Sequence, residues 1–265
     1  MSMSGTAGAF LSAAKAGRFA SLLKTSIGII AFLLALELII LALGIRPYYL
    51  PRPSAIAAAF AATPQAYFLG MWRTLLETVI GFAAGSLFGI GMGVLFHRWT
   101  ALKELFFPLF VVSQTIPVIA FGAVVVLWFG NTLLAKAVIS FYISFLPVTV
   151  NTLLGFATVD PRQVALMRSF GAKEGQILRR LYLPAALPQI FVALKLASSL
   201  SLIGAIVGEW FGDTTGLGVL LLQAMYNENV VGIWVTIVAS ACLGIGLYTL
   251  VSEIERRLVF WGAEQ

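Results

Sequence analysis

The stretch DPRQVALMRSFGAKEGQILRRLYLPAALP, from Asp160 to Pro188, is a polar segment inside a chain that is otherwise very apolar. It holds five of the seventeen Lys and Arg residues, and long apolar runs flank it on both sides. A segment of this composition belongs in water, so it separates two apolar parts of the chain. Its bases are Arg162, Arg168, Lys173, Arg179 and Arg180.

The composition of the whole chain indicates a membrane protein. Its 265 residues are 60% hydrophobic and 11% charged, against about 45–50% and about 25% in soluble domains. Several runs reach the roughly 20 residues that a helix needs to cross about 30 Å of hydrocarbon. The runs without a charged residue are 78–97, 105–135, 137–159 and 229–252, and those with one are 25–45 (Glu37) and 181–208 (Lys195).

The apolar runs predict helices, because backbone groups in lipid must be satisfied within a helix or by barrel closure. The short alternating segments of a membrane barrel are absent from the sequence. We therefore expect an all-α, polytopic membrane protein with about six transmembrane helices. The expected spans are 26–44, 73–96, 106–129, 133–154, 189–208 and 230–252.

The distribution of basic residues predicts the orientation, since Lys and Arg are enriched in cytoplasmic loops. With the N-terminus inside, twelve bases fall on the cytoplasmic side and four outside, at Arg46, Arg52, Arg73 and Lys136. We therefore expect both termini and the 160–188 segment in the cytoplasm. The single cysteine, Cys242, excludes a disulfide within the chain.

Two glycine series recur every four residues, which places each series on one helix face and lets another helix approach closely. They are Gly81, Gly85, Gly89 and Gly93, and Gly204, Gly208, Gly212 and Gly216. The second series should leave its helix after about Gly208, because GDTTGLG is typical of a turn. Pro117 should kink or break the third span.

Within the polar segment, Asp160 and Pro161 predict the start of a helix and Gly171 its end. Leu166 and Phe170 share a face of this helix, with Met167 beside them. A second short helix should run from Ala172 to Pro184. Such a short first helix is marginal alone in water, so it either rests on its own membrane domain or docks on a partner.

The segment resembles the cytoplasmic loop of importer permeases of the ATP-binding-cassette (ABC) class. That motif reads Glu-Ala-Ala, three residues, Gly, nine residues, Ile-x-Leu-Pro. Gly171, Leu181, Leu183 and Pro184 fall at the matching positions, whereas Ala165 replaces the Glu and Leu166 and Met167 replace the alanines. YLPRPSAI, SQTIPVIAFGAVVVLWFG, GEWFGDTTGLG and ERRLVFW extend the resemblance, over about residues 45–262, to the nitrate/sulfonate/taurine branch and its thiamine-precursor relatives.

The resemblance implies a permease subunit in a bacterial cytoplasmic membrane, usually a homodimer. It works with two ATPase subunits that bind ATP and Mg, and with an external solute-binding protein. From the apolar runs and the charges we expect a cytoplasmic segment over 1–25, a permease domain over 26–258 with its coupling loop at about 156–188, and a tail over 259–265. The residues expected to form the coupling helix and its surroundings are Asp160, Arg162, Ala165, Leu166, Met167, Arg168, Phe170, Gly171, Leu181, Leu183 and Pro184.

The chain itself is expected to be no enzyme and to bind no cofactor or metal. It contains no Gly-Lys pair and hence no Walker loop, and Glu37, Glu209 and His97 lack companions for catalysis. Polar groups within spans either line the solute path or join helices by hydrogen bonds. The candidates for the path are Ser113, Gln114, Thr115, Pro117, Asn151, Ser198, Ser199, Ser201 and Glu209.

Other interpretations remain open on the residues alone. Glu209 and Asp213 form part of an outer gate, contact the binding protein, or lie in a solvated acidic turn. An ATP-independent carrier or channel would also have six spans with polar residues. The resemblance implies as solute a small anion of the nitrate, sulfonate or taurine kind, or a compound like the thiamine precursors.

Overall fold

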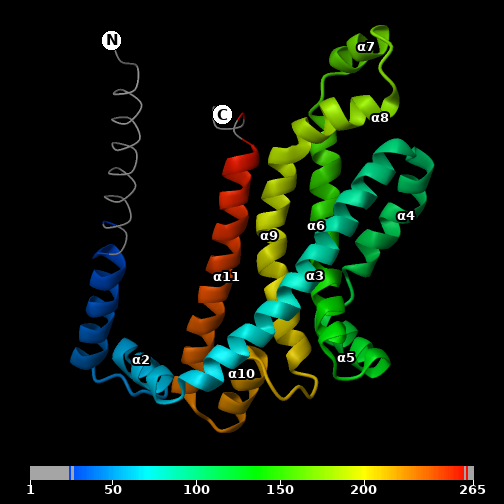
Figure 1. Cartoon of the computed structure of the whole chain (residues 1–265). Helices are drawn as coiled ribbons and strands as arrows, with labels where there is room; N and C mark the ends of the chain where they lie inside the picture. The colour runs from blue at the N-terminus through cyan, green and yellow to red at the C-terminus, as the bar shows by residue number, and fades with distance from the viewer. Residues whose placement is uncertain (1–23, 25–26, 260, 262–265) are drawn as a thin grey trace, which may run out of the picture.

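The protein is described from a computed structural model, which places residue 24, residues 27–259 and residue 261. This part of the chain is almost entirely helical and contains no strand (Figure 1). The prediction of an all-α fold is therefore confirmed.

After a first helix at Ile27–Ala42, the elements are α2 (Pro53–Ala62), α3 (Pro64–Arg98), α4 (Thr100–Ser113), α5 (Val118–Phe129), α6 (Leu133–Ala157), α7 (Pro161–Ser169), α8 (Glu174–Ile177), the π-helical turn η1 (Leu178–Tyr182), α9 (Leu183–Glu209), α10 (Leu217–Tyr226) and α11 (Val230–Leu258).

Each of the six expected spans is helical over most of its length. In the described part of the chain, four helices are long and apolar enough to cross a membrane: α3, α6, the continuous α8–η1–α9 helix and α11. The pair α4 and α5 makes a fifth if it is counted as one bent span. The first helix is shorter than these. The multi-pass membrane architecture is thus confirmed.

The expected kink at Pro117 is a full break. Helix α4 ends at Ser113, Pro117 is the residue that precedes α5, and the two helices meet at 98°. Pro117 has no N–H to continue the ladder of helix α4, and its fixed φ suits the start of a new helix. The long uncharged run therefore folds as two short helices.

Helix α6 lies between α3 and α9, and glycines on both neighbours allow the close approach. A Cβ on Gly89 would lie 2.6 Å from the carbonyl oxygen of Phe145, and one on Gly204 would lie 2.8 Å from the Cα of Ser140. Contacts this short leave no room for a side chain. The predicted packing role of the first glycine series is confirmed, and the second series does leave its helix after Gly208, because α9 ends at Glu209.

The expected stop at Pro184 is wrong. The helix that begins at Glu174 continues without interruption to Glu209. Pro184 lies directly after η1 in this continuous helix, where it donates no N–H to the helical hydrogen-bond ladder. The π-helical turn η1 immediately before it changes the hydrogen-bond spacing, so the helix passes the proline.

Helices α2 and α10 were not predicted. Helix α2 begins beside Glu37 of the first helix, whose carboxylate accepts hydrogen bonds from the Ser54 amide (3.0 Å) and hydroxyl (2.7 Å). This contact gives the one charged residue of the first apolar run a polar partner. In Figure 1, α2 and α10 lie at one end of the bundle, whereas α7, α8 and the C-terminal end of α11 lie at the other.

Candidate functional site

Helix α7 is a short helix with defined ends, placed beyond the spans at one end of the molecule (Figure 1). Asp160 caps its start by accepting a hydrogen bond from the amide of Arg162 at 2.8 Å. Gly171 closes it with φ of +77°, and the amides of Gly171 and Ala172 donate to the carbonyls of Arg168 and Met167. This is a Schellman motif, in which the left-handed position favours glycine. Both predicted boundaries of the helix agree with the structure.

The faces of α7 differ in exposure. Val164 is its buried residue, with 7% of its surface exposed. Leu166 and Phe170 point away from the rest of the chain and are 57% and 82% exposed. Ala165, at the motif position where the family has Glu, is also exposed. Two large apolar side chains thus lie on the open side of a helix outside the spans.

A hollow of about 330 Å³ lies beside Phe170 where α7 turns into α8. It is lined by residues of the turn and by the basic side chain of Arg180. Arg162, Arg168 and Lys173 of the same segment are also exposed. The hollow therefore combines the apolar side chains of Met167 and Phe170 with the base Arg180.

The second half of the motif has a different role from the first. Leu183 packs on the core cluster formed by Phe156, Ala186 and Ile190, and Leu181 and Pro184 are half-buried. These residues attach the α7–α8 segment (residues 158–182) to α6 and α9. The exposed surface of the segment is instead carried by the Asp160–Gly171 half of the motif.

The polar candidates near Pro117 lie at the break between α4 and α5. Gln114 Nε2 donates to the carbonyl of Tyr142 at 2.9 Å, and the Tyr142 hydroxyl donates to the carbonyl of Ser113. Thr115 and Pro117 are exposed on this protomer. Their exposure is compatible with the predicted place beside a solute path.

The candidates on α6 and α9 are mostly satisfied within the chain. Ser198 and Ser201 are fully buried, and the Ser140 hydroxyl donates to the carbonyl of Ser201 at 2.9 Å, which joins α6 to α9. Asn151 donates to the carbonyl of Pro147 one turn earlier, and Ser199 is half-buried. For Ser201 this arrangement favours the alternative role of joining helices, whereas the Ser198 hydroxyl donates to the carbonyl of Lys195 within α9 at 2.8 Å.

Glu209 lies in a buried hydrogen-bond network at the end opposite α7. Only 1% of its surface is exposed, and its carboxylate accepts from the Thr74 hydroxyl at 2.6 Å and from the Gly218 amide at 2.5 Å. Thr74 also accepts from the amide of Leu217 at 2.9 Å. The carboxylate thereby caps the N-terminus of α10, where the positive end of the helix dipole stabilises its negative charge. The interpretation of Glu209 as part of a solvated turn is wrong.

Two ion pairs lie close to this network. Glu77 is fully buried and pairs with Arg73 at 2.9 Å, one turn earlier on the same helix. The fully buried Lys136 pairs with Asp213 at 2.8 Å, and Asn131 joins Lys136 to the carbonyl of Gly212.

Burial alone would raise the pKa of the Asp213 carboxyl. The hydrogen bonds from Lys136 and from the Thr214 amide, together with the positive charge of Lys136, hold this pKa below its ordinary value. Lys136, Thr74 and Asn131 were missed as partners by sequence reasoning, because they contact residues far away in the chain. No periodic pattern marks such contacts.

His97 lies at the end of α3 that is nearer to α7. Its ring packs against those of Phe156 and Tyr182, with centroids 4.8 Å and 4.3 Å away. Among the residues that the structure describes, no group of three His, Cys, Asp or Glu side chains could hold a metal ion. The geometry of His97 is that of an aromatic packing contact.

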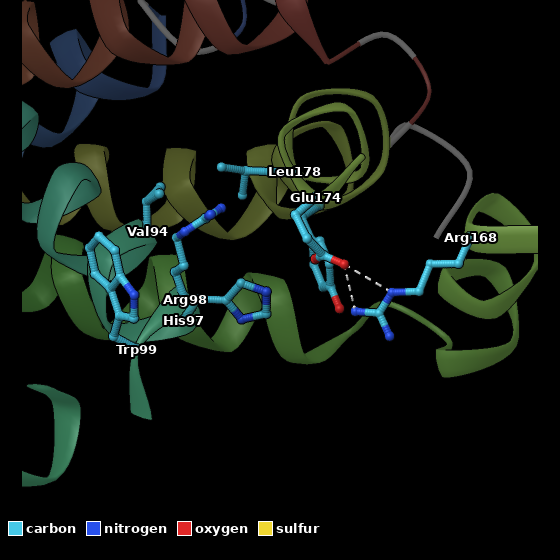
Figure 2. A pocket seen from close by; sticks show the side chains of 8 residues that line it. Val94, His97, Arg98, Trp99, Arg168, Glu174 and Leu178 are labelled. Carbon is cyan, nitrogen blue, oxygen red and sulfur yellow. Dashed lines mark hydrogen bonds and ion pairs between the residues drawn. The ribbon is translucent and has the colours of Figure 1, made fainter. Parts of the chain in front are cut away.

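A cavity of about 470 Å³ lies next to His97, between the end of α3 and the α7–α8 segment. Figure 2 shows the side chains of His97 and Arg98 extending from α3 toward the part that carries Glu174 and Leu178. On its far side, Arg168 of α7 pairs with Glu174 of α8, and its Nε and Nη2 atoms each lie 3.0 Å from the same carboxylate oxygen. The cavity thus has a polar, largely basic lining.

Comparison with known proteins identifies the family. Residues 85–260 match the family described as binding-protein-dependent transport system inner membrane component. The chain is 33% identical to the formylaminopyrimidine transport permease protein ThiX of Halalkalibacterium halodurans, over 83% of this chain and 88% of that protein. It is 28% identical to the taurine transport system permease protein TauC of Escherichia coli, over 90% of each.

A solved structure shares the fold. The inward-facing MetNI methionine ABC transporter superposes with a TM-score of 0.66 at 20% identity, covering 74% of this chain and 98% of that one. The family match runs from the second half of α3 to the end of α11 and includes the α7–α8 segment. The chain therefore belongs to the family of binding-protein-dependent transport system inner membrane components and is a permease subunit of an ABC importer.

Proposed function

We propose that the exposed surface of α7 is the coupling surface of this permease and is held in a cleft of an ATPase carried on another polypeptide. The observation that supports this most strongly is the exposure of Leu166 and Phe170 on a capped helix beyond the spans. Large apolar side chains are favoured in contact with a partner and not in water. The adjoining hollow offers a place for a side chain of that partner.

The assembly proposed is a homodimer of this chain with two ATPase subunits and an extracytoplasmic binding protein. ATP and Mg bind to the ATPase subunits, where hydrolysis takes place. The α7–α8 segment and both termini face the cytoplasm of a bacterial cell, in agreement with the excess of Lys and Arg at that end. Helix α11, with its end beside the α7 side of the bundle, is consistent with this orientation (Figure 1).

The architecture supplies a mechanical route from α7 to the spans. The chain runs from α7 through α8 and η1 into α9 as one continuous helix to Glu209. Leu183 fixes this helix to α6 through the core cluster around Phe156. When ATP-driven closure of the ATPases moves α7, we expect α9 and α6 to tilt together and to change access to the solute path.

Ala165 removes the acidic group that relatives with Glu carry at this motif position. The docking proposed for this chain therefore depends on apolar contacts of Leu166 and Phe170. Arg168 is paired with Glu174, but the exposed bases Arg162 and Arg180 give the same surface a positive charge, so we expect the facing surface of the ATPase to be acidic.

The solute proposed is a small aminopyrimidine-like compound. The support is the higher identity to the permease named for formylaminopyrimidine, 33%, than to the one named for taurine, 28%. Uptake assays with the cognate binding protein and both labelled compounds distinguish the two. Uptake of taurine without uptake of the aminopyrimidine would contradict this assignment and leave the proposed coupling intact.

The coupling role is tested by Gly171→Val in proteoliposomes that contain the ATPase and binding protein. The position has φ of +77°, which a β-branched residue adopts only with strain, so we expect coupled uptake to fall at least about tenfold. Gly175→Val is the matched control, because nothing lies within 4 Å of its Cβ position and its φ is ordinary. Unchanged uptake in Gly171→Val, or wild-type uptake without any ATPase, would instead favour an ATP-independent carrier.

A further inference from the structure

The cavity between α3 and the α7–α8 segment has properties that the coupling role does not require. It is polar, it has a volume of about 470 Å³, and its lining includes His97, Arg98 and Arg168 against a single carboxylate, that of Glu174. Binding sites for small groups commonly have volumes in this range. The charges of the lining decide which kind of group would fit.

The positive charge of the cavity comes from Arg98. Arg168 is already paired with Glu174 through two of its nitrogen atoms. Within the described residues, the contact of the Arg98 guanidinium is with the Trp99 ring, 5.7 Å from the centroid, and no acidic side chain lies within ion-pair distance. One full positive charge in the cavity therefore lacks a counter-charge from this part of the chain.

The position of the cavity relative to the bilayer restricts its occupant. Arg98 ends the long apolar helix α3, and the adjacent Trp99 is 49% exposed. Tryptophan and arginine at the end of a span are typical of the layer where lipid headgroups lie. Basic pockets at this depth on the cytoplasmic side are suited to anionic headgroups.

We propose that this cavity binds a phosphate group, with Arg98 as its main ligand, and that the phosphate belongs to an anionic phospholipid of the cytoplasmic leaflet. A guanidinium offers two parallel N–H groups that match two phosphate oxygens. His97 lines the same cavity, with its ring packed against Phe156 and Tyr182. The cavity also has room for the glycerol part of a headgroup such as that of phosphatidylglycerol.

A lipid in this place would bridge the end of α3 and the α7–α8 segment. Arg168 and Glu174 belong to α7 and α8, and both line the cavity opposite Arg98. The occupant would therefore stabilise the position of α7 relative to the spans. This inference depends on the proposed cytoplasmic orientation of α7, and binding can be measured without ATP or solute.

The test uses the full-length chain in a mild detergent, with phosphatidylglycerol, phosphatidylcholine or inorganic phosphate added, and native mass spectrometry as the readout. We expect phosphatidylglycerol to be retained in preference to phosphatidylcholine. Arg98→Gln should weaken its retention about tenfold, because a charge-assisted bidentate contact is lost. Arg98→Lys should give an intermediate value, since the charge remains and the planar fork is removed.

Lys103→Gln is the control, because it removes one exposed charge from α4 close to the cavity without changing the lining. It should change retention by less than about twofold. Equal losses of phosphatidylglycerol retention in Arg98→Gln and Lys103→Gln would show general attraction to acidic lipid and would contradict a specific site at Arg98. Retention in Arg98→Gln at the wild-type level would overturn it as well.

The inorganic phosphate arm separates the two sources of the phosphate. Arg98-dependent binding of inorganic phosphate, without retention of phosphatidylglycerol, would contradict the lipid and identify a soluble phosphate as the ligand. Loss of ATPase association in Arg98→Gln with unchanged lipid retention would instead assign Arg98 to the protein interface and overturn the proposal. Failure of the lipid test with intact coupled uptake would leave the proposed function in place.

Discussion

The two ends of this permease are built in opposite ways. At the end with α10, charged and polar side chains are buried and paired within the chain, as for Lys136 with Asp213 and Glu209 with Thr74. At the end with α7, apolar side chains such as Phe170 are exposed, and the ion pair of Arg168 with Glu174 lies in solvent. The first end thus holds buried pairs within the protomer, whereas the second holds a capped helix with exposed apolar side chains and a solvent-exposed ion pair.

This difference matches the physical setting of each end. A buried charge without a partner is costly in a medium of low dielectric constant, so the α10 end requires internal pairing. An exposed capped helix can be held in shape by its own ends, by Asp160 and Gly171, without extensive packing. The same chain therefore combines a closed end, at α10, whose buried charges are paired internally, with an open end, at α7, whose short helix is held by its own caps.

The largest effect is expected at the closed end. Asp213→Ala leaves the ammonium of Lys136 fully buried without its counter-charge, which should lower the free energy of unfolding by about 3–5 kcal/mol. The double variant Lys136→Met/Asp213→Ala should recover most of this loss, because no unpaired charge remains. Thermal unfolding monitored by fluorescence-detected size exclusion measures both.

The dependence of this effect on pH follows from the lowered pKa of Asp213. A carboxyl whose pKa is lower in the folded than in the unfolded protein stabilises the fold at pH values above its unfolded pKa, near 3.8. This stabilisation is lost as the pH falls through the pKa of the folded state. The difference between wild type and Asp213→Ala should thus be constant between about pH 6 and about pH 8. A difference that vanishes at neutral pH would contradict the ion pair.

The packing between α3 and α6 gives the next effect. Gly89→Ala places a methyl group 2.6 Å from the carbonyl oxygen of Phe145, and such overpacking costs about 1–3 kcal/mol. Gly91→Ala, on the same helix with nothing within 4 Å of the new methyl group, should be neutral or slightly stabilising. Equal unfolding temperatures for the two variants would contradict the close approach of α3 and α6.

At the open end, loss of the helix cap should have a local effect. Asp160→Ala removes the hydrogen bond to the Arg162 amide and should cost α7 about 1 kcal/mol. Hydrogen exchange should increase over residues 161–169 and stay unchanged in the spans. Asp160→Asn, which retains a capping oxygen, serves as the control and should resemble the wild type. Faster exchange throughout α6 would show that α7 is not an independent unit.

The smallest effect is expected for the exposed pair of Arg168 and Glu174, whose side chains are 59% and 56% exposed. Glu174→Gln should change the free energy of unfolding by less than about 1 kcal/mol, because solvent screens such pairs. Thermal unfolding at low and at high salt measures it. A loss comparable to that of Asp213→Ala would remove the contrast between the two ends.

Much of the fold could be predicted because lipid restricts the alternatives. Charge-free runs of about 20 residues indicate spans, glycines four residues apart indicate a close helix contact, and Asp160 with Gly171 indicates a capped helix. Helix α10 could not be predicted in this way. Its start depends on Glu209, which contacts the Gly218 amide and Thr74, and a contact 135 residues apart leaves no periodic signal.

The prolines also show that local sequence alone does not fix where a helix ends. Pro117 does break its span, whereas the helix continues past Pro184 because the π-helical turn at Leu178–Tyr182 precedes it. Proline alone therefore indicates a place where the hydrogen-bond pattern changes and does not decide between a break and a continuous helix. For the path candidates, burial of Ser198 and Ser201 also depends on neighbouring helices.

The central claim, that the open face of α7 is held by a separate ATPase, is tested most directly by cross-linking from position 170. Phe170→Cys in a Cys242→Ser background places the only thiol of the chain on this face. In inside-out vesicles of the assembled transporter, we predict a cross-link to the ATPase that weakens when ATP changes its conformation. Modification of this thiol only from the outside of right-side-out cells, or no cross-link to any other subunit, would contradict the account.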